Sequence, residues 1–320
     1  MKNVLVVGAG GVGMYFGGMI ARAGHQNVTF YIPRDSKVQA IKSNQGVQMN
    51  CKNFKEKIPI EITSNFDGLS SPDLVLLAVK AGQTKEALIS LTAHLNVATT
   101  PIISLQNGVH NSNAIREAMF PLKPPVIAAT VFVACEMIND VTLQHHGRGE
   151  LRIGEDVSSP SSSAQVSSSL LEQVSDMFKK ASVPCSVSTN IKDDMWMKMN
   201  CNCAFNAISA IGDIEYGKLY TIPHVKTLIE GIVKEYVTIA EKEGVDLKFE
   251  RAMKLNDGIF ESMSTQKSST QQDLMRGKKT EIDYLNGYIC ELGKHHGIPT
   301  PCNQAVYALV KMEEVKLGLS

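Results

Sequence analysis

The sequence predicts an α/β protein in which an N-terminal domain with a doubly wound parallel sheet precedes a C-terminal all-α helical domain. Short apolar runs alternate with helical stretches through the first half of the chain, and a glycine-rich turn directly follows the first run. Alternation of this kind is typical of a parallel sheet that helices cover on both faces. Beyond residue 190 the strand-like runs cease, and only stretches of helical length and composition follow. The chain is therefore expected to divide into residues 1–189 and 190–320.

Length, charge and cysteine content limit the classes of protein to which the chain can belong. The chain has 320 residues, 43% of them hydrophobic, and a formal net charge of zero, so it has no overall basic field for nucleic acid or an anionic membrane. No apolar run is long enough to cross a bilayer and no signal peptide is expected, which favours a cytoplasmic location. The seven cysteines are irregularly spaced and are expected to be reduced core thiols, and no metal site is expected.

The first predicted strand, residues 4–7, runs into the strongest local signal of the N-terminal domain. This turn consists of Gly8, Ala9, Gly10, Gly11, Val12 and Gly13. Gly8 permits a tight turn, Gly10 lets the backbone approach a pyrophosphate, and Gly13 lets the next helix pack closely against the strand. A helix over residues 14–23 and a strand over 28–32 complete a βαβ unit. The unit predicts a dinucleotide site at the N-terminus of the helix.

Further strands of this domain are predicted at residues 73–79, 102–105, 126–133 and 184–187. Residues 141–144 and 150–153 flank the stretch from His145 to Gly149, and are expected to form an antiparallel hairpin at a sheet edge. A serine-rich surface loop at 158–169 leads into a helix at 170–181. Adjacent histidines point to different sides of an element, so surface histidines rather than metal ligands are expected at 145–146 and 295–296.

The helices predicted in the C-terminal domain cover residues 192–210, 223–244, 249–263, 279–297 and 301–316. The first of them carries Lys198, Asn202 and Asn206 in one stripe at helical spacing, between apolar neighbours. A buried lysine is costly unless it is paired, so the stripe is either a solvated polar face or the wall of a cleft. The apolar residues beside it favour the cleft.

Polar residues also follow two predicted strands of the N-terminal domain. Lys80 follows the strand at 73–79, and Asn107 follows the strand at 102–105. Because doubly wound sheets bind ligands at the carboxyl ends of their strands, both side chains are candidates for a ligand site. The alternatives are a solvated lysine and an ordinary Asn-Gly turn.

Acidic residues form a last candidate near the start of the helix predicted at 279–297. Glu281 and Asp283 stand where carboxylates favour the helix dipole, and helix capping is the simpler interpretation of the spacing alone. Ser268 and Ser269 precede them on a polar loop that is uninformative by itself.

Taken in this order, the motifs resemble those of the ketopantoate reductase (2-dehydropantoate 2-reductase) family, and the resemblance covers nearly the whole chain. The matching segments are the glycine turn, Val79-Lys80-Ala81, Gln106-Asn107-Gly108, the lysine–asparagine stripe, Ser268-Ser269 and the string from Thr280 to Gly287. That string and the stripe are far more specific than the glycine turn. The resemblance implies an NADP-binding domain of Rossmann type, coupled to a helical domain for substrate binding and dimerisation.

The resemblance further implies an NADPH-dependent oxidoreductase that reduces ketopantoate to pantoate, on the route to pantothenate and coenzyme A. Lys198 would be the general acid that protonates the ketone oxygen, and Glu281 would hold Lys198 and the substrate hydroxyl in place. The substrate would be bound by Asn107, Asn202, Asn206 and Ser269. The cofactor would be bound by the glycine turn with Arg34, Lys80, Asn107 and Glu281.

Cofactor choice depends on the end of the second strand, where Arg34 and Asp35 are adjacent. An acid at this place favours NAD, and an arginine favours the 2′-phosphate of NADP. Arg34 matches the arginine of the family, so NADP is expected. One departure concerns the substrate: family members often carry a further substrate-contacting asparagine about ten residues after the position of Asn206, and residues 212–217 contain none.

The departure leaves three functions open. The chain is a ketopantoate reductase, a relative that acts on another small 2-keto acid, or a sensor that binds NADP without turnover. Lys198 and Glu281 speak against the sensor, because a pure sensor needs neither. A small keto acid is the expected partner, and the apolar helical faces would suit a homodimer.

Overall fold

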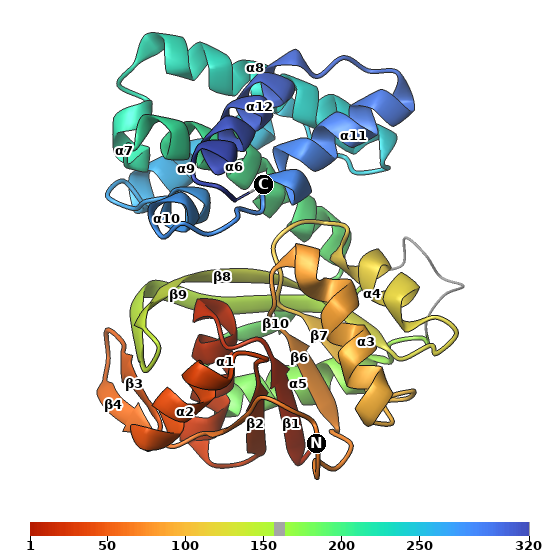
Figure 1. The fold of residues 1–320 in the computed structure, drawn as a ribbon. Helices are drawn as coiled ribbons and strands as arrows, with labels where there is room; N and C mark the ends of the chain where they lie inside the picture. The colour runs from red at the N-terminus through yellow and green to blue at the C-terminus, as the bar shows by residue number, and fades with distance from the viewer. Residues whose placement is uncertain (157–163, 320) are drawn as a thin grey trace. The chain divides into compact units, whose positions relative to one another are not determined.

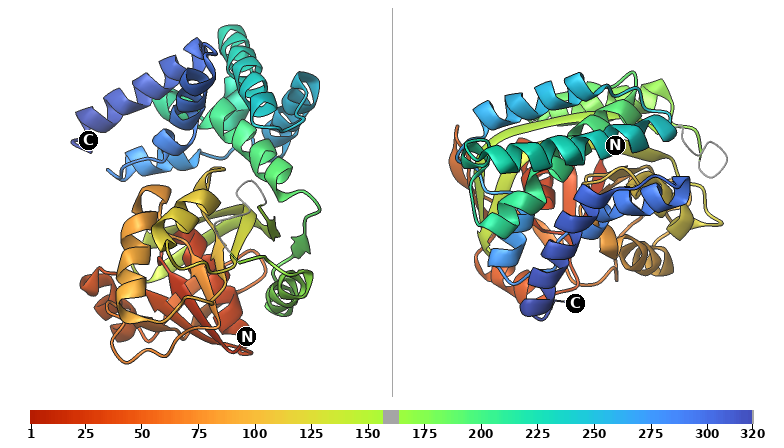
Figure 2. Two further views of the ribbon diagram at one scale, coloured as in Figure 1. Left: turned by 90° about the vertical axis from the view of Figure 1, so that its right-hand side faces the viewer. Right: turned by 90° about the horizontal axis from the view of Figure 1, so that it is seen from above.

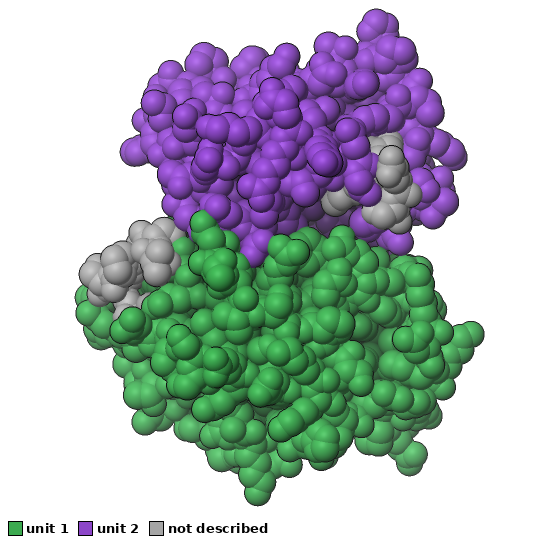
Figure 3. Space-filling view, turned by 180° about the vertical axis from the view of Figure 1, so that it is seen from behind, with its two compact units in different colours: residues 1–191 green, residues 192–320 purple. Residues whose placement is uncertain are grey.

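A computed structural model describes residues 1–156 and 164–319 of the chain, so that the first half of the predicted serine-rich loop, residues 158–163, lies outside the described residues. The chain forms two compact units, Met1–Ile191 and Lys192–Ser320 (Figure 3). Their division lies beside the boundary that the sequence predicts. Within the described residues, no helix combines the length and hydropathy that a bilayer crossing requires.

The described residues of the first unit form one ten-stranded sheet with the order β4-β3-β9-β8-β7-β6-β1-β2-β5, and β10 pairs with β9. The strands are β1 (Asn3–Val7), β2 (Asn27–Tyr31), β3 (Val47–Asn50), β4 (Lys55–Ile58), β5 (Glu61–Thr63), β6 (Leu74–Leu77), β7 (Ile102–Ser104), β8 (Val126–Asn139), β9 (Thr142–Glu155) and β10 (Cys185–Val187). The centre of the sheet, from β7 to β5, is parallel as predicted. The pairs β8–β9 and β3–β4 are antiparallel, so the sheet as a whole is mixed.

Helices cover both faces of this sheet, which explains the continuous apolar runs of its central strands (Figures 1 and 2). The helices are α1 (Gly11–Ala23), α2 (Asp35–Ser43), α3 (Thr84–His94), α4 (Asn111–Met119) and α5 (Ser168–Lys180), with a short 3-10 helix η1 (Ala81–Gln83). Along β1, Val4 and Val6 pack into the core beneath α1, α2 and α5, whereas Leu5 and Val7 pack into the core beneath α3 and α4. The doubly wound arrangement is therefore confirmed.

The hairpin predicted around residues 145–149 is wrong. Residues 142–155 form the single strand β9, which pairs with β3 on one side and β8 on the other, so it does not lie at an edge. The glycines mark a kink within the strand: Gly149 has a φ of +135°, and a Cβ there would come within 2.1 Å of the Tyr15 hydroxyl oxygen. The glycine is needed because α1 packs closely against β9 at this point.

The surface position predicted for His145 is also wrong. Its side chain is buried, its ring lies 4.5 Å from the ring of Tyr15, and its Nε2 is 2.7 Å from the carbonyl oxygen of Arg148. Burial lowers the pKa of His145, so the imidazole is held as a neutral core group.

The second unit is all-helical, as predicted. Its helices are α6 (Ile191–Gly212), α7 (Tyr216–Leu219), α8 (Pro223–Lys242), α9 (Phe249–Ser262), α10 (Ser269–Met275), η2 (Ile282–Tyr284), α11 (Asn286–His296) and α12 (Pro301–Lys316). Buried polar side chains of other helices bond to the backbone of α6: the Tyr236 hydroxyl donates to the Trp196 carbonyl, and the Asn286 amide donates to the Cys203 carbonyl. These bonds fix the long helix inside its unit.

The single helix predicted at 279–297 is two elements instead. Leu285, with φ −115° and ψ −105°, separates η2 from α11. The segment before this break is held by α12: the buried carboxylate of Glu314 accepts hydrogen bonds from the backbone N–H and the hydroxyl of Thr280, at 2.7 and 2.6 Å. Lys311 lies 2.7 Å from the same carboxylate. Tertiary bonds that no local pattern encodes therefore override the helical composition.

Replacement of Glu314 tests this anchor. Burial alone would raise the pKa of Glu314, but the bonds from Lys311 and Thr280 outweigh it and hold the pKa below the ordinary 4.5. A depressed carboxylate pKa contributes stability that is present above 4.5 and is lost as pH falls through the folded-state value. Glu314→Gln should lower the free energy of unfolding by about 1–3 kcal/mol at neutral pH, and the deficit should shrink in acid.

Urea denaturation at neutral and acidic pH measures this difference. Glu313→Gln is the matched control, because Glu313 pairs with Lys316 at the exposed end of the same helix. It should change the free energy of unfolding by less than about 0.5 kcal/mol. If Glu314→Gln lowers the free energy of unfolding equally at both pH values, the Glu314 carboxylate does not stabilise the fold through its ionised form.

Candidate active site

The residues predicted to bind the cofactor lie at one edge of the first unit's sheet. Strands β7, β6, β1 and β2 are parallel neighbours, so their carboxyl ends meet at the same edge. Asn107, Lys80, the glycine turn and Arg34 follow these four strands in that order. The sheet thus brings together side chains that are up to a hundred residues apart in sequence, at the place where doubly wound sheets bind ligands.

The glycines of the turn differ in whether the fold of the protein leaves room for a side chain at their positions. Gly8 has a φ of +107°, and a Cβ on Gly13 would lie 2.0 Å from the Gly8 carbonyl oxygen, so turn geometry and helix packing both demand glycine. A Cβ on Gly10 would have no described atom within 4 Å, and the residue is exposed at φ −77°. No described side chain caps α1 at this end. Open space beside uncapped helix N–H groups fits a pyrophosphate.

Lys37 is a feature of this turn that sequence reasoning missed. It lies on α2, is only 4% exposed, and donates from Nζ to the Ala9 carbonyl oxygen at 2.6 Å. The lysine thus braces the turn and brings a positive charge beside it. The one sequence signal was its place three residues after Arg34, on a helix that was not predicted.

Arg34 and Asp35, the two candidates for cofactor discrimination, have different partners. Arg34 is exposed at the start of α2 and pairs with Asp140, in the turn between β8 and β9. The Asp35 carboxylate accepts a hydrogen bond from the Ser64 hydroxyl at 2.9 Å. A guanidinium at the end of β2 suits an anionic group on the adenosine ribose.

Gln106 links the two strand ends that carry Lys80 and Asn107. Its buried amide donates to the Val79 carbonyl at 3.0 Å and to the Thr84 hydroxyl at 2.8 Å. One side chain after β7 therefore fixes the loop after β6. The bonds explain why the glutamine before Asn107 belongs to the motif, a role that the sequence alone did not assign.

In the second unit, the predicted stripe lies on α6. Lys198 and Asn202 are half-buried, and Asn206 is 2% exposed. Apolar neighbours on the helix, including Met195 and Met199, are buried. Such burial is unlike a fully solvated polar face and leaves amide and ammonium groups in a sheltered setting, where they interact strongly with a polar ligand.

The structure brings Ser269 to the stripe. The Asn206 Nδ2 lies 3.4 Å from the Ser269 hydroxyl oxygen, and the Ser268 hydroxyl donates to the Asn206 carbonyl at 3.1 Å. The polar loop predicted here is wrong, because Ser268 caps α10 by accepting from the Gln271 N–H and Ser269 is the first helical residue. The cap fixes Ser269 beside α6.

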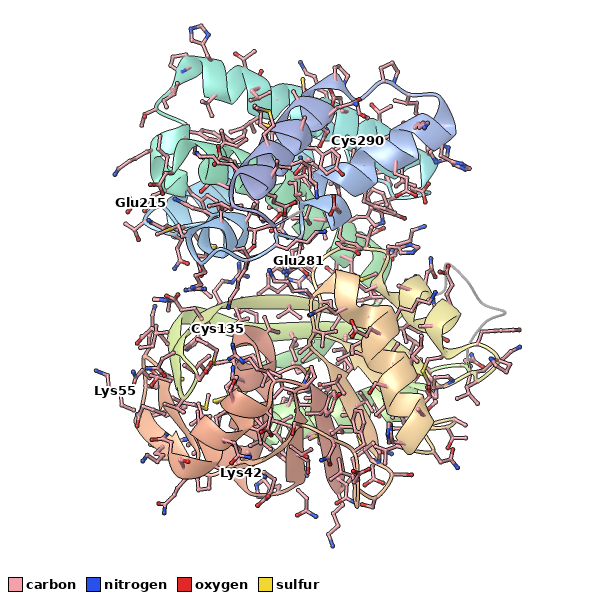
Figure 4. All side chains as sticks on the ribbon, in the orientation of Figure 1. Lys42, Lys55, Cys135, Glu215, Glu281 and Cys290 are labelled. Atoms are coloured by element: carbon pink, nitrogen blue, oxygen red, sulfur yellow. The ribbon has the colours of Figure 1, made fainter. Side chains whose placement is uncertain are left out.

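Glu281 lies immediately before η2 in the second unit, where Figure 4 labels it. It is half-buried, and its side chain makes no capping bond to η2, so the capping interpretation is wrong for this residue. Asp283 is also held elsewhere, since it accepts from the Tyr307 hydroxyl and from Lys311. These anchors fix the segment that carries Glu281. The roles of Lys198 and Glu281 in catalysis stay predictions.

Comparison with protein families gives two matches that together cover most of the chain. Residues 4–157 match the family described as ketopantoate reductase PanE/ApbA. Residues 190–314 match the family described as ketopantoate reductase PanE/ApbA C terminal. The two matches fall on the first and the second unit respectively.

Individual proteins give the same result. The 2-dehydropantoate 2-reductase of Vibrio cholerae is 30% identical over 317 residues, 98% of each chain. The crystal structure of a PanE/ApbA family ketopantoate reductase from Ralstonia eutropha superposes with a TM-score of 0.87 at 37% identity, covering 99% of this chain and 100% of that one. A D-mandelate dehydrogenase bound to NADH and anilino(oxo)acetate has a TM-score of 0.89 at 22% identity over 99% and 100%, and so shares the fold.

Two alanine substitutions separate the roles of the glycines. Gly13→Ala forces a Cβ against the Gly8 carbonyl and should destabilise the first unit by about 1–3 kcal/mol or more. Gly10→Ala has room in the protein and should leave the melting temperature nearly unchanged. It should weaken binding of NADPH at least ~10-fold, because the methyl group would occupy the space where a pyrophosphate is expected. Thermal melts and NADPH fluorescence titration measure the two effects. Wild-type affinity in Gly10→Ala would contradict a pyrophosphate at this turn.

Proposed function

Since the chain belongs to the ketopantoate reductase family, we propose that it reduces 2-dehydropantoate to pantoate with NADPH, and that Lys198 is the general acid. The observation that carries this proposal is the polar face of α6. A half-buried lysine shares that face with two asparagines, of which Asn206 is buried and bonded to Ser269. The arrangement provides one acid and several neutral polar groups, which is the set that reduction of a hydroxylated keto acid requires.

In this proposal, the first unit holds the cofactor. The glycine turn and the N-terminus of α1 bind the pyrophosphate, Arg34 binds the 2′-phosphate, and Lys80 and Asn107 line the nicotinamide end. Bound NADPH supplies the hydride. The sheet edge supports the proposal, because it aligns all four elements at the carboxyl ends of parallel strands.

The second unit supplies the remaining groups. When a carbonyl carbon accepts hydride, negative charge develops on its oxygen, and the Lys198 ammonium donates a proton there. Asn202, Asn206 and Ser269 orient the carboxylate and hydroxyl of the substrate without competing for that proton. Glu281 holds the Lys198 ammonium and the substrate hydroxyl in position. The product is a 2-hydroxy acid, which would enter pantothenate and coenzyme A synthesis.

A second candidate function is reduction of another small 2-keto acid. It is favoured by Tyr216, which stands ten residues after Asn206 where the family often has asparagine. A phenol in place of an amide changes both the size and the hydrogen bonding of that position. The cytoplasmic location and the homodimer stay predictions under either function.

Turnover with a panel of keto acids tests the proposal. Wild-type protein should oxidise NADPH faster with 2-dehydropantoate than with pyruvate or 2-oxoisovalerate. Lys198→Met, which keeps the length but removes the charge, should lower kcat about 10²–10⁴-fold and leave NADPH affinity unchanged. Lys218→Met is the control, because this lysine of the same unit is 69% exposed at its side chain. Full activity of Lys198→Met would exclude the assigned acid.

Replacement of Arg34 tests the choice of NADPH. Arg34→Ala should raise the Michaelis constant for NADPH about 10–100-fold, the equivalent of a lost charge-assisted hydrogen bond, and change that for NADH little. Arg22→Ala is the matched control, since Arg22 is also an exposed arginine paired with a carboxylate, that of Glu56 at 2.8 Å. An unchanged Michaelis constant for NADPH would show that Arg34 does not bind the phosphate.

A further inference from the structure

Tyr216 is a buried tyrosine whose hydroxyl bonds directly to the candidate substrate site. It is 7% exposed and begins α7, just after Glu215, which Figure 4 labels. Its hydroxyl donates to the Oδ1 of Asn206 at 2.7 Å. No role follows for this residue from the motifs of the sequence, which indicate only that an asparagine is missing there.

The bond determines which groups of Asn206 face a ligand. A primary amide has one acceptor oxygen and two N–H donors. Tyr216 engages the oxygen, while Nδ2 lies 3.4 Å from the Ser269 hydroxyl oxygen. The opposite orientation of the amide would leave the buried phenol without its acceptor, which is costly. The Nδ2 of Asn206 therefore lies on the side of Ser269, and of its two N–H groups one donates to that hydroxyl.

The tyrosine ring is itself held in place. It packs 5.6 Å from the ring of Phe205, on the same helix as Asn206. The backbone of α7 is tied to the segment before α10, since the Tyr216 N–H donates to Gln266 and the Gly217 N–H donates to Ser264. Burial raises the pKa of Tyr216, so the hydroxyl keeps its proton and remains a donor at neutral pH.

We propose that Tyr216 is a positioning residue that commits Asn206 to act as a hydrogen-bond donor toward an oxygen of the keto-acid substrate. The proposal rests on the proposed function and deepens it. One N–H of Asn206 donates to the Ser269 hydroxyl, which leaves the second N–H to donate to an acceptor-only group. A 2-keto acid has two such groups, and because the ketone oxygen is assigned to Lys198, the carboxylate remains for Asn206. Tyr216 thereby supports recognition of the carboxylate, and its hydroxyl is not available for the hydroxyl of a longer substrate.

Tyr216→Phe and Tyr236→Phe form a matched pair for the test. Both remove one hydroxyl from a buried tyrosine of the second unit, but the Tyr236 hydroxyl donates to the Trp196 carbonyl at 2.7 Å. Tyr216→Phe should raise the Michaelis constant for the keto acid about 5–20-fold with less than a ~2-fold change in kcat or in NADPH affinity. Tyr236→Phe should lower stability without this change. Equal Michaelis constants in the two variants would overturn the proposal.

Asn206→Asp tests the direction of the hydrogen bond. Aspartate has nearly the same shape and still accepts from Tyr216, but it has no N–H to donate and repels a carboxylate. The Michaelis constant for the keto acid should therefore rise about 100-fold or more. Retention of the wild-type constant would show that Asn206 acts as an acceptor, and would overturn the proposal.

Wild-type turnover of NADPH with any keto acid tests the proposed function separately. If the wild-type protein turns over none, the same variants are compared by their thermal stabilisation with 2-dehydropantoate. A smaller stabilisation of Tyr216→Phe than of Tyr236→Phe supports the positioning role even without catalysis. Equal stabilisation of the two variants, or none in the wild type, overturns it.

Discussion

The close approach of α1 to the end of β1 is the constraint on which the first unit depends. The helix can begin at the strand end only because Gly13 has no side chain to meet the Gly8 carbonyl. That approach leaves the first N–H groups of α1 beside the open space at Gly10, and it seats α1 against β9, where Tyr15 requires the kink at Gly149. Close packing of α1 thus demands glycine both in the turn after β1 and in a strand more than a hundred residues away.

The second unit is organised by a different kind of interaction. Its long helix α6 carries polar side chains that are buried or half-buried inside the unit. Buried amides and hydroxyls of neighbouring helices form hydrogen bonds to this helix. Buried polar networks of this kind are costly when incomplete, so each member restricts the orientation of the next. The Asn206 amide illustrates this, because Tyr216 and Ser269 occupy its two ends. Under the proposed function, Asn206 would be oriented in part by Tyr216, a residue that would not itself touch the substrate.

Features that depend on local rules could be predicted from the sequence, whereas features that depend on tertiary contacts could not. The glycine turn, the central strands and helix α12 depend on local steric and periodic rules, and the prediction of α12 agrees with the structure at both ends. The kinked strand β9 and the break at Leu285 depend on tertiary contacts, of Tyr15 in one case and Glu314 in the other. Lys37 was missed because its partner is a backbone carbonyl, which leaves no pattern in side-chain types.

The same reasoning explains why the sequence indicates a cofactor class more sharply than a substrate. Dinucleotide phosphates are bound largely by backbone N–H groups, and the glycines that expose them are visible as a motif. A keto acid is bound by side chains whose donor or acceptor character depends on their neighbours. Asn206 has the same identity whether it donates or accepts, and the hydroxyl of Tyr216 favours one of the two orientations of its amide. If Tyr216 positions Asn206 as proposed, substrate choice depends on a residue that does not itself touch the substrate.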